Sequence, residues 1–261
     1  MTLLTVSGLH KSFGGVVAAR DVSFDVARGE LVALIGPNGA GKSTTFNMVG
    51  GQLPPDRGSI TLDGMAIDHL PPRSIWRLGT GRTFQIAQTF ISMTAAENVQ
   101  IALQSAAKST FALWRSANAL FRGEAIELLR SVGLAASADH PVGALAYGDI
   151  KRVELAIALA GAPKLLLMDE PTAGMARNER HDLMRLITRL AQGRGLGVLF
   201  TEHDMDAVFG HANRVLVLVR GEIVARGTPD EVQADAIVQR MYLGTSGARA
   251  AAEAARPRAM P

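Results

Sequence analysis

The chain has no cysteine among its 261 residues. This absence excludes disulfide bonds and thiolate metal sites, and it fits a reducing compartment. No run of about 18 uncharged apolar residues occurs, so we expect no membrane-spanning helix. The first ten residues, MTLLTVSGLH, lack a basic segment followed by an apolar run, so we expect no signal peptide.

The charge of the chain is nearly balanced. It carries 27 Lys and Arg against 24 Asp and Glu, a net charge of +3. The basic residues are spread along the chain, so we expect no nucleic-acid partner. Apolar residues make up 48% of the chain, enough to bury a core, and the length suits one α/β domain or one core with a smaller subdomain.

Short apolar segments separated by turn residues predict β-strands in residues 3–62. A helix should begin after Gly41 and run towards Val49, where Gly50-Gly51 ends it. The expected turns lie at Gly14-Gly15, Arg28-Gly29 and Asp56-Arg57-Gly58. The expected strands are LLTVSGL, VVAARDVSFDV, ELVALIG and SITLDG.

The pattern changes to helical periodicity between Thr94 and Ala162, as in EAIELLRSVGL and IKRVELAIALA. Residues 106–121 show no clear period and are expected to form a loop-rich insert. After Pro163 an α/β alternation returns, and the residues after Gly244 are rich in Ala, Arg and Pro, which predicts a disordered tail. The expected elements of this second α/β part are the strand LLLMD, a helix over 178–191, the strand GVLFTEH, and a hairpin that turns at Arg220-Gly221.

The segment Gly36-Pro-Asn-Gly-Ala-Gly-Lys-Ser43 follows the apolar strand LVALI and fits the pattern G-x-x-x-x-G-K-[ST]. Its glycines let backbone N–H groups converge on phosphate oxygens, and the following helix adds the positive end of its dipole. Lys42 brings an ammonium to the β- and γ-phosphates, and Ser43 brings a hydroxyl to Mg²⁺. A chance glycine-rich turn is the alternative, but the strand before and the helix after favour a nucleotide site.

The apolar segment LLLMD ends in Asp169, and a second acid, Glu170, follows directly. The strand would deliver Asp169 to the Mg²⁺ ion, directly or through water, and place Glu170 where it can polarise a water that attacks the γ-phosphate. A solvated strand end is the alternative, which the phosphate loop earlier in the chain disfavours.

The segments GPNGAGKST, LAYGDIKRVELA, LLLMDEPTAG and FTEHD occur in an order and spacing that resemble the nucleotide-binding domain of ABC (ATP-binding cassette) proteins. The resemblance covers residues 3 to about 244. It implies a P-loop NTPase (RecA-like) α/β core with an antiparallel β subdomain and an inserted α-helical subdomain. The implied division is an ATP-binding domain over 1–244, with the helical subdomain at about 86–162, and a tail over 245–261.

Within this family the chain most resembles the ATPase subunits of branched-chain amino-acid permeases. That resemblance is carried by GRTFQ at 81–85, LAYG at 145–148, TAG at 172–174 and TEHD at 201–204. It implies an ATPase subunit at the cytoplasmic face of the inner membrane that energises an importer of branched-chain amino acids or a related small polar solute. An importer of urea or short amides stays open as an alternative.

The resemblance also implies roles for single residues. Phe13 would stack on adenine, and Gln85 would contact Mg²⁺ or the attacking water at the boundary of the helical subdomain. His203 would contact the γ-phosphate, so the expected catalytic residues are Glu170, His203 and Gln85, and the expected metal ligands are Ser43, Gln85 and Asp169. The expected nucleotide-binding residues are Phe13, Gly36, Asn38, Gly39, Ala40, Gly41, Lys42, Ser43, Thr44, Ala146, Tyr147, Gly148 and Asp149.

The segment Leu145–Asp149, hereafter the signature segment, would cap the γ-phosphate on a second cassette. Two positions depart from the family pattern. Ala146 replaces the usual Ser and removes one hydroxyl contact, and Ala176 stands where Asp or Asn is usual. The implied partners are a second ATP-binding subunit, expected to be a paralogue, then transmembrane permease subunits and, indirectly, a solute-binding protein.

Two other classes of protein are alternatives. A soluble ABC protein acting on ribosomes or DNA usually has two cassettes or a coiled-coil insert, and this chain has one cassette and no heptads. A P-loop kinase or GTPase would not explain LAYGD or His203, and no N-K-x-D guanine-binding sequence occurs. Release of free phosphate, rather than a phosphorylated substrate, separates an ATPase from a kinase.

Overall fold

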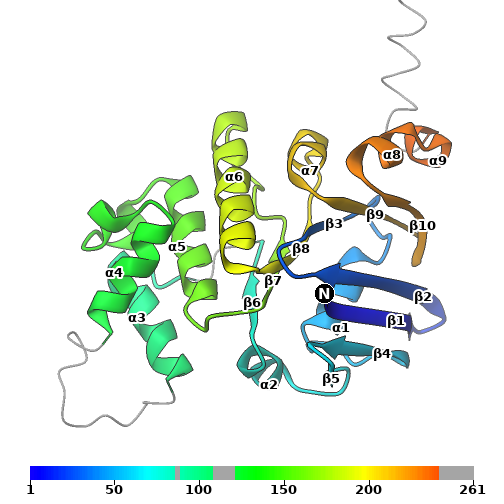
Figure 1. Ribbon diagram of the computed structural model, residues 1–261, viewed down its shortest axis with the longest axis horizontal. Helices are drawn as coiled ribbons and strands as arrows, with labels where there is room; N and C mark the ends of the chain where they lie inside the picture. The colour runs from blue at the N-terminus through cyan, green and yellow to red at the C-terminus, as the bar shows by residue number, and fades with distance from the viewer. Residues whose placement is uncertain (86–88, 108–120, 241–261) are drawn as a thin grey trace, which may run out of the picture.

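The computed structural model describes residues 1–85, 89–107 and 121–240. Most of the predicted loop-rich insert at 106–121 and the whole predicted tail lie outside the described residues. Two β-sheets and the helices that cover them make up the described part, in an α/β fold (Figure 1). The predicted α/β class is therefore confirmed.

The larger sheet has six strands among the described residues, in the order β10-β9-β3-β8-β7-β6. The five strands from β9 to β6 run parallel, and β10 pairs with β9 as the predicted hairpin. The strands are β3 (Leu31–Ile35), β6 (Thr80–Thr83), β7 (Leu165–Asp169), β8 (Gly197–Thr201), β9 (Arg214–Val219) and β10 (Glu222–Gly227).

Strand β3 lies at the centre of this sheet, and all five of its residues are buried. Leu31, Ala33 and Ile35 point to one face, where they pack with the buried residues of helices α6 (Arg177–Arg194) and α7 (Met205–His211). Val32 and Leu34 point to the other face and pack with helix α1 (Lys42–Val49) and the smaller sheet. Burial on both faces explains why this strand is apolar throughout.

The smaller sheet is antiparallel, with the order β2-β1-β4-β5 among the described residues. The expected turn at Asp56-Arg57-Gly58 is wrong for its last two residues, because β4 begins at Arg57. A Cβ atom on Gly58 would lie 2.4 Å from the carbonyl oxygen of Gly8, so this glycine permits close strand pairing rather than a turn. The strands are β1 (Thr2–Phe13), β2 (Val16–Ala27), β4 (Arg57–Leu62) and β5 (Met65–Ala66).

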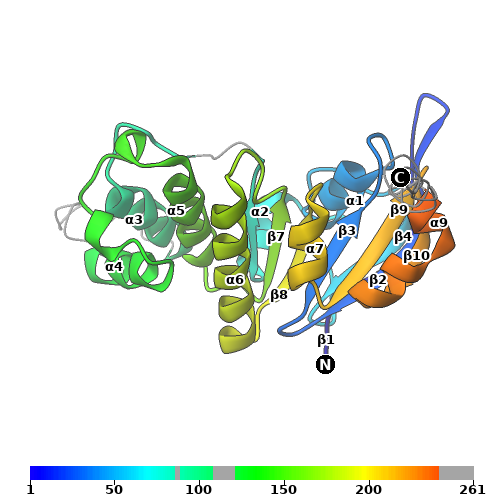
Figure 2. The same ribbon diagram turned by 90° about the horizontal axis from the view of Figure 1, so that it is seen from above.

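Three helices, α3 (Ala95–Ala106), α4 (Arg122–Ser131) and α5 (Tyr147–Leu159), form a group beside α6 (Figures 1 and 2). They correspond to the predicted helical part between Thr94 and Ala162. Strand β6 and helix α2 (Pro72–Arg77) come just before this group, and neither was predicted. Helices α8 (Pro229–Ala234) and α9 (Ala236–Val238) follow β10. Across the described residues, no helix is long and apolar enough to cross a membrane.

The strand predicted as GVLFTEH ends two residues early, at Thr201. The backbone N–H of His203 donates to the side-chain Oε2 of Glu202 at 3.0 Å instead of continuing a sheet ladder. Asp204 then begins helix α7 as its N-cap, accepting the N–H of Ala207 at 2.9 Å. The residues after β8 therefore form a tight loop at the edge of the sheet.

Candidate nucleotide site

The phosphate loop, residues 36–43, runs from the carboxyl end of β3 into the start of α1 and lies close to one strand of each sheet. A Cβ atom on Gly36 would lie 2.1 Å from the carbonyl oxygen of Leu218 on β9. A Cβ atom on Gly41, whose φ is 101°, would lie 2.1 Å from the carbonyl oxygen of Ala18 on β2. Only glycine fits at either position, so the sequence pattern fixes the path of the loop into the helix.

Lys42 is the first residue of α1 and is buried. Its Nζ donates to the carbonyl oxygens of Gly36 at 2.7 Å and Pro37 at 3.1 Å, so the ammonium lies over the loop. Burial lowers the pKa of Lys42, and the nearby carboxylates of Glu170 and Asp169 act against that shift. A cation placed there among backbone donors can bind phosphate.

The carboxyl ends of β7 and β8 lie side by side, with Asp169 opposite Thr201. Thr201 Oγ1 donates to Asp169 Oδ1 at 2.6 Å. The backbone N–H of Glu170 lies 3.2 Å from the carbonyl oxygen of Thr201 and 3.1 Å from its hydroxyl. Glu170 has a φ of 47°, a left-handed conformation that is strained for a residue other than glycine. These contacts turn the chain sharply after the strand and hold Glu170 at the sheet edge.

The Glu170 carboxylate brings together the three predicted catalytic residues. Gln85 Nε2 donates to Glu170 Oε2 at 2.9 Å, and His203 Nε2 lies 2.9 Å from Glu170 Oε1. These residues follow strands β6, β7 and β8, which are neighbours in the sheet. A carboxylate held through both oxygens in this way is well placed to accept a hydrogen bond from a water.

Glu202, which precedes His203 in the chain, was missed by the sequence analysis. Its carboxylate is buried, and Oε1 accepts both the N–H of Thr172 at 2.8 Å and the hydroxyl of Thr172 at 2.6 Å. Its Oε2 accepts the N–H of His203 at 3.0 Å. Glu202 therefore joins the loop that carries Glu170 to the loop that carries His203. A charged residue between Thr201 and His203 on an apolar strand is the sequence signal that could have revealed it.

The other residues predicted to bind the nucleotide lie on the phosphate loop, at the end of β1 and in the signature segment. Asn38 and Gly39 are exposed on the phosphate loop, Ala40 is buried within it, and Ser43 and Thr44 follow Lys42 on the first turn of α1. Phe13 lies at the end of β1 and is 48% exposed, with Lys11 Nζ 5.7 Å from the centre of its ring. Its side chain is thus free to stack on a flat ligand.

The signature segment lies at the start of α5, with Ala146 as the N-cap and Tyr147 and Gly148 as the first helical residues. Within the described residues, no hydrogen bond joins it to the phosphate loop. The ring of Tyr147 is exposed and lies against Gly174, where a Cβ atom would be 3.3 Å from its Cε1 atom. The structure therefore does not bring the two predicted halves of the nucleotide site together in one chain.

The predicted metal ligands Ser43, Gln85 and Asp169 offer hydroxyl, amide and carboxylate oxygens, which suit a hard cation. Nowhere in residues 1–85, 89–107 or 121–240 do three or more His, Asp or Glu side chains form a group that could hold a metal by themselves. These donors therefore fit an ion that keeps water or phosphate oxygens as most of its ligands.

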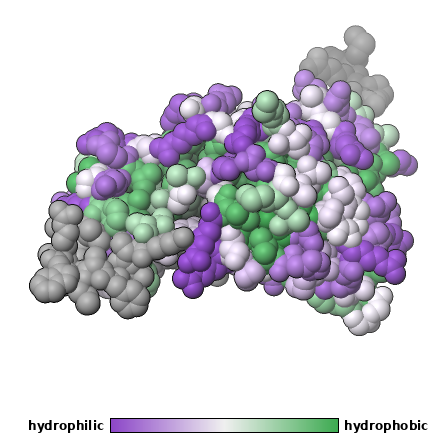
Figure 3. Space-filling model, turned by 60° about the horizontal axis from the view of Figure 1, so that its bottom comes forward, coloured by the Kyte–Doolittle hydropathy of each residue, from purple (hydrophilic) through white to green (hydrophobic). Residues whose placement is uncertain are grey.

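A groove runs between the sheet and the helical group, next to Gln85. Figure 3 shows the side of the molecule on which α2 lies, with apolar side chains gathered near the middle and polar side chains beside them. The guanidinium of Arg82 lies over the rings of Phe46 and Phe84, 5.7 Å and 5.1 Å from their centres. Residues that line the groove include Ile75, Trp76, Thr80, Arg82, Phe84, Ala102, Ser105 and Ile157.

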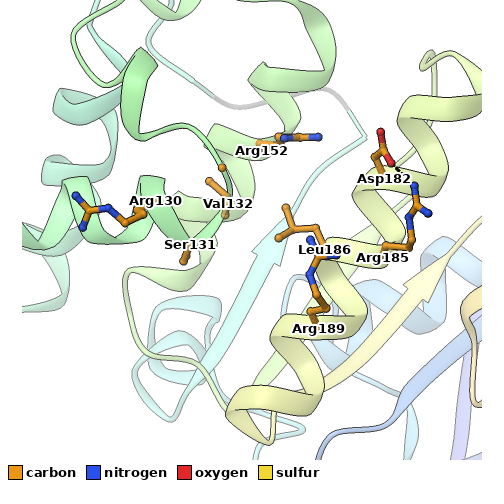
Figure 4. Close-up of a pocket in the computed structure, with 9 residues that line it drawn as sticks. Arg130, Ser131, Val132, Arg152, Asp182, Arg185, Leu186 and Arg189 are labelled. Carbon is orange, nitrogen blue, oxygen red and sulfur yellow. Dashed lines mark hydrogen bonds and ion pairs between the residues drawn. The ribbon is translucent and has the colours of Figure 1, made fainter.

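A second cavity lies between α4, α5 and α6, away from the phosphate loop (Figure 4). Arg152 of α5 and Arg189 of α6 line it, and Arg185 pairs with Asp182 on the same helix. None of the predicted site residues contributes to this cavity.

The fold and the phosphate loop define a P-loop nucleotide-binding protein. The ABC transporter family model matches residues 19–173. Over 249 residues the chain is 38% identical to the high-affinity branched-chain amino acid transport ATP-binding protein LivG of Salmonella typhimurium and to BraF of Pseudomonas aeruginosa, covering 93% of this chain and 98% of each relative. It is also 38% identical over 244 residues to the lipopolysaccharide export system ATP-binding protein LptB of Haemophilus influenzae, covering 94% of this chain and 98% of that protein.

Solved structures that are similar to this chain are also ATP-binding cassettes of ABC transporters. The crystal structure of the ATP-binding cassette MJ1267 in its ADP conformation has a TM-score of 0.83 and 31% identity, covering 94% of this chain and 99% of that one. A nucleotide-free cassette from an ABC transporter has a TM-score of 0.82 and 30% identity, covering 93% of this chain and 99% of that one. The chain belongs to the ABC transporter family. It is an ATP-binding ATPase subunit of a transporter, and its fold is that of a P-loop NTPase, as predicted.

Proposed function

We propose that this ATPase subunit energises the import of branched-chain amino acids or a related small polar solute. The similarity to LivG and BraF over nearly the full length of each protein supports this substrate class. An importer of urea or short amides is an alternative. A lipopolysaccharide exporter is a second candidate, because LptB is similar to the same extent.

The contact of Gln85 and His203 with the two oxygens of Glu170 is the observation that carries the proposed hydrolysis. Glu170 accepts a proton from the attacking water, and Gln85 orients that water through its amide. His203, which is 50% exposed at its side chain, can turn to donate to an oxygen of the γ-phosphate. Lys42 and the loop N–H groups hold the phosphates, and Phe13 stacks on the adenine.

Ser43, Gln85 and Asp169 would hold Mg²⁺ in this proposal. The ion would neutralise charge on the β- and γ-phosphates when it is bound. The hydroxyl of Thr201 fixes one carboxylate oxygen of Asp169. The Asp169 carboxylate lies near enough to Lys42 of the phosphate loop to act against the lowering of the Lys42 pKa.

The second half of each site comes from a second cassette. Ala146, Tyr147, Gly148 and Asp149 would lie against the γ-phosphate held by the partner chain. Ala146 offers no hydroxyl, so backbone N–H groups and the dipole of α5 provide the contact. ATP would then join the two cassettes, and its hydrolysis would let them separate.

The groove next to Gln85 is the proposed docking site for a cytoplasmic segment of a permease subunit. Its aromatic and apolar lining, with Arg82 at one wall, suits an amphipathic helix. Because Phe84 lines the groove and Gln85 follows it, closure of the nucleotide site would move the docked segment. We place the chain at the cytoplasmic face of the inner membrane as a peripheral subunit, with the ATP-binding domain over 1–244 and the helical subdomain at about 86–162.

Uptake measurements in cells that lack the gene test the substrate class. Uptake of labelled leucine, isoleucine and valine should fall, and a normal copy of the gene should restore it while a Lys42→Ala copy should not. Normal uptake of all three, with loss of urea or acetamide uptake, would support the alternative importer. Normal uptake of every solute together with less lipopolysaccharide at the cell surface would identify the exporter instead.

A further inference from the structure

A buried ion pair lies on helix α5, just after the signature segment. Lys151 Nζ lies 3.3 Å from Glu154 Oε2, and both side chains are at most 5% exposed. Burial raises the pKa of Glu154, while the N–H of Phe84 and the ammonium of Lys151 act against that shift. Burying a charged group costs free energy unless it is paired and hydrogen-bonded. These two charges therefore need further partners that compensate their burial.

Both members of the pair hold the backbone at Gln85. Lys151 Nζ donates to the carbonyl oxygens of Phe84 at 3.0 Å and Gln85 at 2.8 Å. Glu154 Oε1 accepts the N–H of Phe84 at 2.7 Å. Three hydrogen bonds thus hold the backbone of Phe84 and Gln85 against α5, and Gln85 carries the side chain that reaches Glu170.

The same helix carries the residues that would serve the partner's nucleotide. Lys151 Nζ lies 5.9 Å from the centre of the Tyr147 ring, which packs on Gly174 in the loop after β7. Gln85, whose backbone Lys151 holds, donates its side-chain amide to the Glu170 carboxylate. A continuous set of contacts therefore runs from Glu170 through Gln85 and Lys151 to Tyr147.

We propose that Lys151 and Glu154 are positioning residues that couple the two ATP sites of the cassette dimer. Gln85 would contact the nucleotide bound by its own chain. Lys151 and Glu154 attach Gln85 to helix α5, whose first residues would contact the nucleotide bound by the other chain. A displacement of Gln85 when one ATP is hydrolysed therefore shifts the signature segment at the second ATP. This inference rests on the proposed two-cassette site.

Stability alone does not account for the pair. Replacing a buried ion pair by apolar residues of similar size often leaves a protein equally stable, whereas removing one partner strands the other charge. The distinguishing property of Lys151 and Glu154 is that their contacts end on the backbone next to a catalytic side chain. Their replacement should therefore change turnover and cooperativity more than folding.

The double variant Lys151→Met/Glu154→Leu, in the full chain with its second cassette, tests the proposal. Replacing both charges avoids a stranded ion, but the backbone groups of Phe84 and Gln85 lose their partners. The thermal unfolding midpoint therefore shows whether the variant still folds. We expect kcat to fall at least ~10-fold and the Kd for ATP to change less than ~3-fold. The Hill coefficient for ATP should fall from above 1 in the parent to about 1.

A double-mutant cycle with Gln85→Ala shows whether the effect passes through Gln85. In the Gln85→Ala background, the Lys151/Glu154 double variant should cost less than ~2-fold further in kcat. The control is Arg152→Met, which removes the neighbouring cation on α5, one that faces the cavity in Figure 4. It should change kcat by less than ~2-fold and leave the Hill coefficient unchanged.

Equal losses of kcat in both backgrounds would overturn the positioning role, and so would unchanged kcat with a lowered unfolding midpoint. A parent Hill coefficient of 1 would overturn the coupling. These outcomes differ from failure of the proposed two-cassette site, in which adding the second cassette would leave the ATP hydrolysis of the parent chain unchanged. A double variant that does not fold would also overturn the proposal, since it would assign the pair a structural role.

Discussion

His203 Nε2 lies 2.9 Å from Oε1 of Glu170, although the two residues belong to different strand ends. The opposite carboxylate oxygen accepts the Gln85 amide at the same distance. Glu170 is thereby held from two sides in a strained left-handed backbone conformation. Such an arrangement fixes the carboxylate before a substrate arrives, which is what a general base requires.

Lys42 should be essential for ATP binding. Lys42→Ala removes the buried ammonium that lies over the phosphate loop, and a hydrogen bond from a charged group is worth about 1.5–3 kcal/mol. ATP affinity should therefore fall at least ~10-fold, measured by equilibrium dialysis. Lys164→Ala removes an exposed lysine that pairs with Asp63 and should leave the affinity unchanged. Equal affinity in Lys42→Ala and the parent would refute the phosphate-loop assignment.

Glu202 should act on turnover through the position of His203. Glu202→Gln replaces an acceptor oxygen by a donor amide, so buried N–H groups of Thr172 or His203 lose their partner at about 1–3 kcal/mol. We expect kcat to fall ~10-fold or more and the Kd for ATP to change less than ~3-fold. Thr188→Val removes a hydroxyl bonded within α6 and is the control. Unchanged kcat in Glu202→Gln would show that His203 needs no such support.

Much of the fold could be predicted from the sequence, because apolar strands and the phosphate loop carry local signals. Strand β6 could not, since its four residues, TGRT, are polar and short and become buried only by pairing with β7. Lys151 and Glu154 look like an ordinary exposed ion pair three residues apart on a helix. Only the packing of Phe84 against α5 shows that they are buried and hold the backbone at Gln85.

The three predicted catalytic residues were inferred from family resemblance, and the sequence alone could not show that they meet. Gln85 and Glu170 are 85 positions apart. Their contact depends on the order of strands β6, β7 and β8, which the one-dimensional pattern does not give. Glu202 was missed for the same reason, because its partner Thr172 lies on another strand end.

Asp204 should make stability depend on pH in the acid range. Burial acts to raise the pKa of Asp204, but the N–H of Ala207 and the guanidinium of Arg180 outweigh it, so the pKa is lowered overall. The carboxylate therefore stabilises the fold above the unfolded-state pKa of about 3.9, and this contribution is lost as pH falls through the lower folded-state pKa.

Asp204→Ala should accordingly cost about 1 kcal/mol of unfolding free energy at pH 7, as loss of an N-cap does. The difference from the parent should shrink below about pH 4 in urea unfolding. Asp206→Ala breaks an exposed pair with Arg177 and should cost less than ~0.5 kcal/mol at either pH. A difference for Asp204→Ala that stays constant down to acid pH would contradict the assignment.

The working unit should be a dimer of two different cassettes. Ala146 and Ala176 stand where the family usually has polar residues, so the two composite sites of the dimer would be unequal, as expected for a pair of different cassettes. Copurification of the assembled transporter should recover one copy of this chain, one paralogous cassette and the permease subunits. Recovery of two copies of this chain, with no other cassette, would rule out the heterodimer.

Hydrolysis by Glu170→Gln tests the central claim most directly. The substitution keeps the shape of the side chain and removes its charge, so ATP should still bind while hydrolysis falls roughly hundred-fold or more, as expected when a general base is lost. Phosphate release is measured alongside size-exclusion chromatography with ATP and Mg²⁺, with and without the paralogous cassette. We expect negligible phosphate and an ATP-bound dimer, and near-normal turnover would contradict the account.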